Sequence, residues 1–565
     1  MVAAANPLAA RAGVAILEKG GNAIDALLAV QWVLNVVEPQ ASGIGGGAFI
    51  LYYDHHSRRV HALDGREESP RSTDPRMFLD AQGQPVRFYP DRVSGGLPVG
   101  VPGTVAVMHY AWQHFGSRTI PFQDTFDAAI PLARHGFRIS PRLALAIQSN
   151  QARLERTAAS RSVFLPGGRV PAVGEVLRQT DLADTMELIA HSGPAVFYQG
   201  EIGDDVVRTV HANRISRGHL SKQDLMNYRA VSRSVLMGRF RGHSIYTMPS
   251  PSSAVTVLQS LALLDRFSDA DLLQTTANGI HLKLEAEKLA FADRALYLAD
   301  RDFQNVNERA LIAPSYTRQR SRLIQKSRAL PAPAKAGQVP GIESYLTSEA
   351  PDRREGQHTS HIAIVDQHGN AVSCTTTIEM GFGSALTVPG RGFVLNNELT
   401  DFDPELYRAN SLESGWRKRR SAVGKNENEQ LGGKRPRSSM SPIIVLDGKG
   451  QLRYVLGSPG GSRIIGVVSA VLLRLLVDRM DMQSAINAPR ALHRHSDQAE
   501  MEYILLRQQG LRRQLESRGH SFKSISPLNH VYGGVQGIHV LEDGSLEGGA
   551  DLRREGAAIA VEEML

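Results

Sequence analysis

Two threonines stand where a β-hairpin would bring them face to face. The runs His361–Val365 and Ala371–Ile378 are apolar or β-branched, and the polar stretch between them contains glycine, a pattern that predicts two strands and a turn. If the chain turns near His368, Thr359 lies opposite Thr377. We therefore expect two hydroxyl groups at one end of this hairpin.

The segment before Thr359 suggests how one of these hydroxyls could become a nucleophile. Residues 329–356 carry four prolines and few apolar side chains, which predicts an exposed, mobile linker. Cleavage before Thr359 would free an α-amine, with an ordinary pKa of about 7.7–8.0, which can accept the hydroxyl proton at neutral pH. Threonines are also common in strands without any chemistry. The spacing alone leaves both interpretations open.

A glycine-rich turn could stabilise the oxyanion of such a reaction. Gly457–Ser462 follows a predicted strand and leads into the apolar helix Ile464–Val477, so free backbone N–H groups would gather there. Glycines also let a substrate oxygen approach the main chain closely. No Gly-Lys-Ser/Thr sequence follows, which excludes a Walker-type phosphate loop. Taken alone, the turn fits a structural role equally well.

Three further motifs could bind nucleotides or nucleic acid, but each favours another role. Gly43–Gly47 resembles part of a dinucleotide fingerprint, yet a helix precedes it and a strand follows, the reverse of the required order. We expect a tight, closely packed turn there. The basic runs Trp416–Arg420 and Lys434–Arg437 could grip phosphate, but they lie in a long polar loop. We expect a mobile, solvated flap.

Metal binding has little support in the sequence. The pairs His55 and His56, and His493 and His495, could be ligands, but no carboxylate or cysteine cluster accompanies them. Histidines in polar loops are more often solvated, and this is what we expect of all four. Cys374 is the only cysteine, which excludes an internal disulfide and a cysteine-based zinc site.

Composition indicates a large globular protein. The 565 residues include 64 basic and 57 acidic side chains, a net charge of +7, with 42% apolar and 21% charged residues. These values exclude wholesale disorder and indicate one large fold or two to three domains. The charge excess is too small to indicate nucleic acid by itself. The apolar runs Ala26–Val37 and Ile464–Val477 are shorter than the roughly 18–20 uninterrupted residues of a membrane span.

The coarse order of elements is helix, helix and hairpin, then a mainly helical middle from about residue 120 to 330, then a β-rich part. The helices predicted with bounds are Leu8–Lys19, Ala23–Val37 and Gly279–Asp300, and the further strands are Ala48–Asp54, Val60–Asp64, Gly392–Leu395, Ile443–Leu446 and Arg453–Leu456.

Together these residues resemble the gamma-glutamyltransferases (gamma-glutamyltranspeptidases) of the N-terminal nucleophile hydrolase fold. The resemblance runs nearly end to end and includes several short motifs in order. They are Gly20–Asp25, Val37–Gln40, Gly43–Gly47, Asp64–Glu67, Pro249–Ser253, Glu285–Lys288, Thr359–His361, Gly369–Val372, Asn396-Asn397, Arg437–Pro442 and Gly457–Arg463.

The resemblance implies an α/β (α+β) fold, a four-layer α-β-β-α sandwich. It also implies self-cleavage between His358 and Thr359. A large subunit (1–358) and a small catalytic subunit (359–565) would then remain one intertwined body. By the same resemblance, Thr359 is the nucleophile, Thr377 orients it, and Gly460 and Gly461 are oxyanion donors.

The resemblance also implies two groups of substrate-binding residues. One holds the α-carboxylate of a gamma-glutamyl group and the other its α-amine, tasks that suit a guanidinium with hydroxyls and a set of acids, respectively. These residues are Arg66, Ser438 and Ser439 for the carboxylate, and Asp401 with Glu379 and Glu398 for the amine.

The implied reaction has two steps and needs no metal or organic cofactor. Thr359 attacks the gamma-amide of glutathione or a similar donor, and the gamma-glutamyl ester passes to water or to the amine of an amino acid or peptide. A near alternative is an acylase of the same fold acting on a glutaryl-cephalosporin. A distant alternative is a non-catalytic basic protein that binds nucleic acid through the loop Trp416–Arg437.

Some positions depart from the family pattern. Glu379 stands where many members have Asn, and Thr400 replaces the first acid of a frequent Asp-Asp pair. Three acids together crowd negative charge unless a cation lies between them, which favours an amino-bearing donor over a glutaryl group. The segment Asp403–Gly433 differs from the family lid, and Tyr407 and Trp416 are its candidate aromatic residues.

The expected location follows from two opposing observations. The resemblance implies a periplasmic or secreted protein. Met1 is followed directly by Val-Ala-Ala-Ala-Asn-Pro, without the charged and apolar segments of a signal peptide, as if the chain began inside a folded domain. The sequence therefore leaves a cytoplasmic location open.

Overall fold

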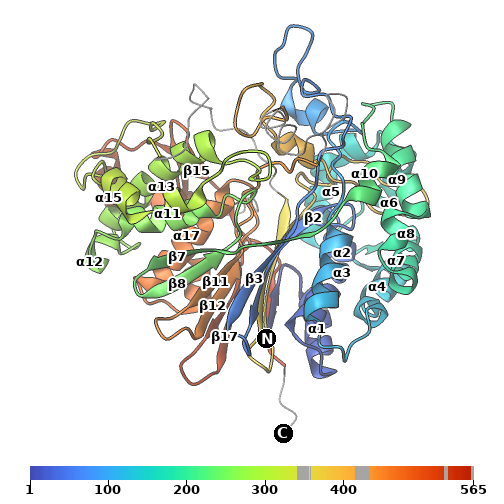
Figure 1. Cartoon of the computed structure of the whole chain (residues 1–565), viewed down its shortest axis with the longest axis horizontal. Helices are drawn as coiled ribbons and strands as arrows, with labels where there is room; N and C mark the ends of the chain where they lie inside the picture. The colour runs from blue at the N-terminus through green and yellow to red at the C-terminus, as the bar shows by residue number, and fades with distance from the viewer. Residues whose placement is uncertain (340–355, 357, 414–432, 527–531, 562–565) are drawn as a thin grey trace.

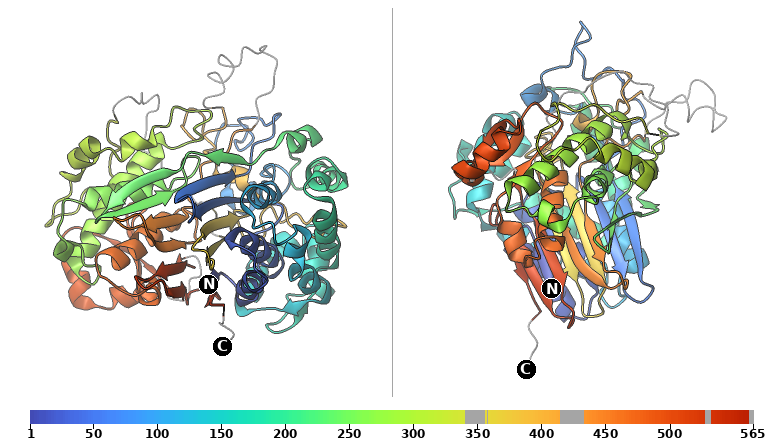
Figure 2. Two further views of the ribbon diagram at one scale, coloured as in Figure 1. Left: turned by 60° about the horizontal axis from the view of Figure 1, so that its bottom comes forward. Right: turned by 90° about the vertical axis from the view of Figure 1, so that its left-hand side faces the viewer.

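Two β-sheets lie face to face in the middle of the molecule, and helices cover the outer side of each (Figure 1). The computed structural model describes residues 1–339, 356, 358–413, 433–526 and 532–561. The left view of Figure 2 again shows the strands in the middle, with helices on both sides. The four-layer α-β-β-α sandwich is thus confirmed.

Both large sheets are antiparallel throughout. The seven-stranded sheet runs in the order β18 (Ala557–Ile559), β1 (Val2–Ala4), β9 (Thr359–Val365), β10 (Ala371–Thr377), β2 (Gly47–Asp54), β3 (Arg59–Gly65) and β6 (Val231–Arg233). The six-stranded sheet runs in the order β17 (Leu546–Ala550), β16 (Gln536–Val540), β12 (Leu452–Gly457), β11 (Ile443–Leu446), β8 (His243–Thr247) and β7 (Leu236–Phe240). The small strands are β13 (Ala491–Leu492), β14 (Ala499–Glu502) and β15 (Phe522–Ile525) in one sheet, and β4 (Phe137–Arg138) and β5 (Val176–Leu177) in another.

Helices from the first part of the chain cover the seven-stranded sheet, on the right of Figure 1. They are α1 (Pro7–Glu18), α2 (Ala23–Val37), α3 (Thr104–Phe115), α4 (Ala129–His135), α5 (Pro141–Leu154), α6 (Ala158–Phe164), α7 (Thr180–Ser192), α8 (Ala195–Tyr198), α9 (Glu201–His211) and α10 (Lys222–Asn227). The helices of the opposite side are α11 (Val255–Leu264), α12 (Asp269–Leu272), α13 (Ala277–Tyr297), α14 (Glu308–Leu311), α15 (Pro314–Ser321), α17 (Arg463–Leu476), α18 (Met482–Asn487), α19 (Tyr503–Leu506) and α20 (Gln509–Glu516).

The alternation of side chains along β9 divides the core in two. Ile362 and Ile364 pack in the cluster that contains α1 and α2, whereas Ala363 and Val365 pack in the cluster that contains β11, α11, α13 and α17. All four are at most 3% exposed. Because successive side chains of a strand point to opposite faces, one strand joins both cores.

Each large sheet is built from both sides of residue 358. Strands β1, β2, β3 and β6 precede it and β9, β10 and β18 follow it in the seven-stranded sheet, while β7 and β8 precede it in the other. The N-terminal strand β1 lies between β18 and β9, with Val2 opposite both Ile559 and Ile364. The two parts of the chain are therefore intertwined.

Most predicted elements are confirmed within one or two residues, and helix Ala23–Val37 has the predicted bounds. The prediction of a strand at Gly392–Leu395 is wrong, because this segment forms only single β-bridges of Val394 and Leu395 to neighbouring loops. The mainly helical middle also holds β6, β7 and β8, which the sequence analysis did not predict.

The described part of the predicted linker, 329–339, is less exposed than expected. Ala334 and Val339 are 7% and 4% exposed and belong to the core between α11, α13 and the six-stranded sheet. Residues 340–355 lie outside the described part of the chain. In that described part, none of the helices combines the length and apolar character needed to cross a membrane.

Candidate functional site

The hairpin of β9 and β10 brings the two predicted threonines together. Thr359 pairs with Thr377 in the strand register, and their Oγ1 atoms are 3.3 Å apart. Thr377 Oγ1 donates to the carbonyl oxygen of His358 at 2.9 Å and accepts from the backbone N–H of Glu379 at 2.9 Å. Thr377 donates its single hydroxyl proton to the carbonyl oxygen of His358. In the contact between the threonines, Thr359 is therefore the donor.

Charged side chains that sequence analysis did not single out hold the start of β9. Arg554 Nη1 donates to the carbonyl oxygen of Thr359 at 2.8 Å. Ser360 Oγ donates to Glu38 Oε2 at 2.7 Å, and Glu38 in turn forms a buried ion pair with Arg142. Glu38 lies in a motif quoted above, but Arg142 and Arg554 carry no local signal, because their partners are distant in the sequence.

The guanidinium of Arg66 lies at the centre of the acidic residues. Arg66 follows β3 and is 1% exposed. Its Nη1 pairs with Glu398, and its Nη2 lies 2.5 Å from Asp401 Oδ2. Its Nε and Nη2 also donate to the carbonyl oxygens of Pro436 and Arg437 at 3.1 and 3.2 Å. Arg66 is therefore a cation of the protein itself beside two of the three predicted acids, Glu398 and Asp401.

A third carboxyl group shares this buried environment. Glu67 Oε2 lies 3.9 Å from Arg66 Nη1, and both Glu67 and Glu398 are at most 1% exposed. Burial, followed by the charge of Glu398, raises the pKa of Glu67 well above its ordinary value. Burial also raises the pKa of Glu398, an effect that Arg66 opposes. One guanidinium cannot balance the charge of all these acids, and this crowding favours the neutral form of Glu67.

Glu379 occupies a strained position beside the threonines. Its backbone φ is +76°, in the left-handed region that Asn tolerates better than Glu. Asn397 Nδ2 donates to its Oε2. Burial, then the charges of Asp401 and Glu398, raise the pKa of Glu379 well above its ordinary value. The crowding of negative charge predicted from the sequence is present.

The two predicted serines lie on a segment fixed by a second serine-rich loop. Ser253 N–H donates to the carbonyl oxygen of Ser438 at 2.7 Å, and Ser438 N–H donates to that of Pro251 at 2.8 Å. Arg294 Nη2, from α13, donates to Ser439 Oγ at 2.7 Å. The segment Pro249–Ser253 therefore helps to hold Ser438 and Ser439 in place.

The turn between β12 and α17 brings Gly461 to the threonines. Gly460 and Gly461 have φ values of +133° and +58°, which side chains disfavour. A small cavity of about 20 Å³ joins the site, and nine of the ten predicted residues line it, Gly460 being the exception. The lining residues are Arg66, Thr359, Thr377, Glu379, Glu398, Asp401, Ser438, Ser439 and Gly461, with Gly356, Met440 and Ile464.

The turn Gly43–Gly47 has the predicted packing role, and it serves the same site. A Cβ on Gly46 would lie 2.1 Å from the carbonyl oxygen of Thr377, so no side chain fits there. Gly46 also accepts hydrogen bonds through its carbonyl oxygen from Gly103 and Thr104, at 2.7 and 2.9 Å. The turn supports β10 from behind.

The prediction of a solvated flap at Lys434–Arg437 is wrong. Lys434, Arg435 and Arg437 are 0%, 2% and 8% exposed. Arg435 pairs with Asp64 at 2.5 Å and with Glu68 at 2.8 Å, so carboxylates of the β3 region draw this segment inward. Trp416–Arg420 lies outside the described residues, and so does the lid candidate Trp416. Tyr407, the other candidate, is 76% exposed.

The prediction of solvated histidines is correct for one pair and wrong for the other. His55 and His56 are exposed in the turn between β2 and β3. His493 and His495 are 1% and 7% exposed. Their segment follows β13, which packs on α13, and this contact buries them.

Comparisons with known proteins agree with this arrangement. The family model for gamma-glutamyltranspeptidase matches residues 9–561. The glutathione hydrolase proenzyme of Bacillus subtilis strain 168 is 38% identical over 99% of this chain and 91% of its own, and that of Escherichia coli K12 is 34% identical over 98% and 90%. The crystal structure of a cephalosporin acylase from Bacillus halodurans superposes with a TM-score of 0.83 at 27% identity, covering 98% of this chain and 94% of its own. The chain therefore belongs to the gamma-glutamyltranspeptidase family.

Proposed function

We propose that this protein is a gamma-glutamyl hydrolase and transferase that uses Thr359 as its nucleophile and acts on glutathione and related donors. The observation that supports this most is the meeting of Thr359, Thr377, Arg66 and the paired acids around one cavity. A hydroxyl nucleophile, a cation and carboxylates within one site match the amide, α-carboxylate and α-ammonium of a gamma-glutamyl donor.

The first proposed reaction is maturation of the chain itself. Thr359 Oγ1 attacks the carbonyl carbon of His358, the peptide bond between the residues breaks, and an ester forms in its place. Breaking that bond frees the α-amine of Thr359. Water then hydrolyses the ester, which restores the Thr359 hydroxyl and leaves His358 with a terminal carboxylate. The hydrogen bond from Thr377 Oγ1 to the carbonyl oxygen of His358 supports this step, because it polarises the bond that breaks. The products are a large subunit, 1–358, and a small subunit, 359–565.

The proposed catalytic cycle uses the freed amine as the base. It takes the proton of Thr359 Oγ1 as that oxygen attacks the gamma-carbonyl, and returns it to the leaving amine. The backbone N–H groups of Gly460 and Gly461 stabilise the oxyanion. Water or the amine of an amino acid or peptide then attacks the gamma-glutamyl ester and restores Thr359. Every group in the cycle belongs to the chain or the substrates.

Donor binding would exchange one ion pair for another. Arg66 is already paired with Glu398 and Asp401, so an entering donor offers its α-carboxylate to Arg66 and its α-ammonium to the acids. The buried charges stay balanced only if the donor carries both groups. Ser438 and Ser439 would supply hydroxyl donors to the carboxylate. This exchange is why we favour gamma-glutamyl donors.

A glutaryl-cephalosporin acylase remains the second candidate, supported by the similarity to the cephalosporin acylase structure. A glutaryl group lacks the amine, so its binding would leave the acids around Arg66 without a cation. Comparing gamma-glutamyl and glutaryl anilides as substrates separates the candidates. We expect kcat/KM for the gamma-glutamyl compound to be higher by at least about 100-fold, the scale of a lost buried charge pair.

The test of the proposal is denaturing electrophoresis of the purified protein, with sequencing of the smaller band. We expect two bands and a smaller fragment that begins Thr-Ser-His-Ile. Thr359→Ala should give one band and no activity, and Thr359→Ser should keep part of both. Thr376→Ala is the matched control, since Thr376 Oγ1 contacts the carbonyl oxygen of Gly47 at 3.3 Å instead. An active preparation with an intact chain would overturn the proposal.

The proposed location is periplasmic or secreted, on the family resemblance, and the proposed partners are small donors and acceptors. Binding of nucleic acid finds no support at Lys434, Arg435 and Arg437, because these cations are buried.

A further inference from the structure

A second cavity lies apart from the catalytic one and is much larger, about 580 Å³. One wall is the segment Gln325–Ala332, and the others are residues of 493–499 and 518–521, with Lys288 of α13. It shares no lining residue with the catalytic cavity. Its volume falls in the range of roughly 300–1,000 Å³ that small-molecule sites occupy.

The lining of this cavity is cationic. Lys288, Arg328 and Arg518 face one acid, Asp497. Lys288 is itself neutralised by Glu285 at 2.8 Å, so Arg328 and Arg518 carry the excess charge. Neither arginine forms an ion pair with an acid among the described residues. A cavity with this charge favours an anion.

Two buried polar atoms of the lining also point to a ligand. His493 is 1% exposed, and neither its Nδ1 nor Arg518 Nη1 has a hydrogen-bond partner among the described residues. A buried polar group without a hydrogen-bond partner is unfavourable, because it has lost its bonds to water. Burial lowers the pKa of His493 to about 3, so its ring is neutral. In the tautomer that carries its proton on Nδ1, His493 would donate to an oxyanion in the cavity, as would Arg518 Nη1, and both atoms would be satisfied.

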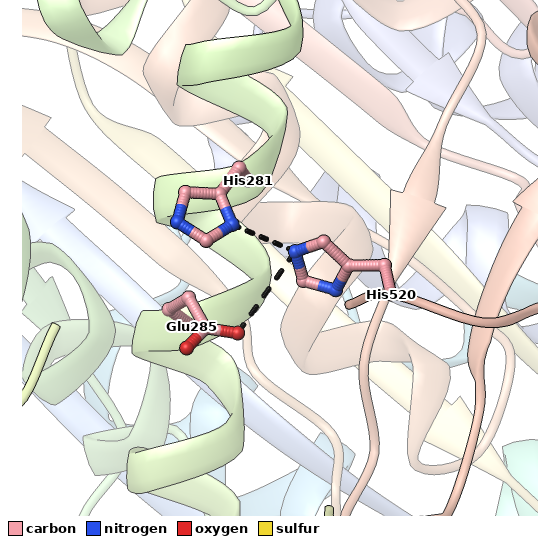
Figure 3. A group of neighbouring side chains, drawn as sticks. All are labelled: His281, Glu285 and His520. Carbon is pink, nitrogen blue, oxygen red and sulfur yellow. Dashed lines mark hydrogen bonds and ion pairs between the residues drawn. The ribbon is translucent and has the colours of Figure 1, made fainter. Parts of the chain in front are cut away.

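The neighbouring group His281, Glu285 and His520 is a hydrogen-bonded unit rather than a metal site (Figure 3). His281 Nδ1 and His520 Nε2 are 2.7 Å apart, the distance of an N–H···N bond. Two nitrogens bound to one tetrahedral zinc at 2.0–2.1 Å would lie roughly 3.4 Å apart. Glu285 is moreover bound by Lys288 and by the backbone N–H of Leu330, at 2.8 and 2.6 Å.

The hydrogen bonds of this unit fix its protons. His281 Nε2 lies 2.7 Å from the carbonyl oxygen of Gln325, which can only accept, so Nε2 carries the proton. His281 Nδ1 therefore accepts from His520 Nε2. Burial, then the charge of Lys288, lower the pKa of His520 to about 2, so this wall stays neutral. The positive charge of the cavity comes from its arginines.

We infer that this cavity, the Arg518 pocket, is a binding site for a small oxyanion, a carboxylate or a phosphate, held by Arg328, Arg518 and His493. Lining residues come from both sides of residue 358, Gln325–Ala332 before it and His493–Ser521 after it. A bound anion would therefore also bridge these two parts of the chain. The site is independent of the proposed chemistry at Thr359.

The test is isothermal titration calorimetry of the purified protein with inorganic phosphate and, separately, with citrate, at constant chloride. We expect saturable binding of at least one anion, and the tighter of the two identifies the ligand class. Arg518→Gln and Arg328→Gln should each weaken binding at least tenfold. Arg328 is exposed, so its variant serves even if the Arg518 variant does not fold.

Two controls locate the bound anion. Arg512→Gln removes an exposed arginine that pairs with Glu516 on α20, and it should bind as the wild type does. Arg66→Gln, in the catalytic cavity, should also keep full anion binding. The inference is overturned if neither anion gives saturable binding, if the Arg328 and Arg518 variants bind like the wild type, or if binding is lost with Arg66→Gln.

Discussion

The catalytic cavity and the Arg518 pocket both contain arginines, but they use them in opposite ways. Arg66 is 1% exposed and already holds Glu398 and Asp401, and the cavity beside it measures about 20 Å³. Arg518 lines about 580 Å³ and keeps a buried Nη1 with no partner among the described residues. One arginine is paired in advance, and the other faces open space.

The difference indicates two modes of recognition. At Arg66 a ligand must replace an internal ion pair, so only a molecule that supplies both a cation and an anion keeps the buried charges balanced. At Arg518 a ligand fills a site in which no described carboxylate forms an ion pair with the arginine, so a simple anion suffices. A site in which the ligand must replace an ion pair selects ligands by the arrangement of their positive and negative groups. A site that the ligand simply fills selects mainly by the sign of the ligand's charge.

The largest effect is expected when the internal ion pairs of Arg66 are broken. Arg66→Gln should lower kcat/KM for a gamma-glutamyl anilide about 100-fold, mostly through KM, since losing one partner of a buried charge pair costs about 3 kcal/mol. Self-cleavage should persist, because Arg66 is assigned to the donor. Steady-state kinetics and electrophoresis measure both, with Arg66→Lys as the conservative control. Normal turnover in Arg66→Gln would contradict the idea that the donor binds by replacing the ion pairs of Arg66.

A smaller effect is expected when the nucleophile loses its hydroxyl neighbour. Thr377→Val removes the contacts to Thr359 and to the His358 carbonyl, and should lower kcat and the rate of self-cleavage by about tenfold or more, given that a hydrogen bond contributes about 1–2 kcal/mol. KM should change little, because Thr377 touches no donor charge. Thr376→Val, one residue earlier on β10, is the control. Equal rates in both variants would refute an orienting role for Thr377.

The crowded acids should make stability depend on pH. The pKa of Glu379 is raised in the folded state by burial and by Asp401 and Glu398, so its stabilising contribution is complete below pH 4.5, its unfolded value, and declines as the pH rises toward the folded value. Glu379→Gln cannot ionise and should gain about 1 kcal/mol over the wild type at pH 8, the scale of a buried polar penalty.

At pH 4 the same variant should gain nothing, since both side chains are then neutral. Urea denaturation at both pH values measures the free energy of unfolding. If Glu379→Gln changes the free energy of unfolding equally at the two pH values, the change comes from packing and not from ionisation of Glu379.

The smallest expected effect is a difference in salt dependence between ligand binding in the two cavities. Raising sodium chloride from 20 to 200 mM shortens the screening length to below about 10 Å, which weakens interactions of exposed charges more than those of buried pairs. Phosphate binding at the Arg518 pocket should weaken about threefold or more, while KM for the donor should change less than twofold. Equal salt dependence would remove the distinction between the two modes.

The sequence was most informative where chemistry follows local pattern. The opposition of Thr359 and Thr377 depends only on one hairpin and its turn, and it was predicted. The family resemblance located the acids, but it could not show that Arg66 would bind Glu398 and Asp401, since these contacts span more than 300 residues.

The two wrong predictions of solvent exposure share one physical cause. Lys434–Arg437 and the pair His493 and His495 look solvated because their neighbours in sequence are polar. Their partners in space, Asp64, Glu68 and the residues of α13, are far away in the chain. Polarity of a segment indicates exposure only when no distant charge compensates it.

The interleaving of strands from both sides of residue 358 has a consequence for how the protein could be assembled. Neither fragment alone can complete a sheet, so severed halves mixed afterwards would each present unpaired strand edges, and these favour aggregation. We therefore expect the fold to be reached while the polypeptide is still continuous. If the bond before Thr359 is cut, the α-amine of Thr359 becomes free. We then expect the denatured protein to refold poorly, because its two fragments are no longer joined.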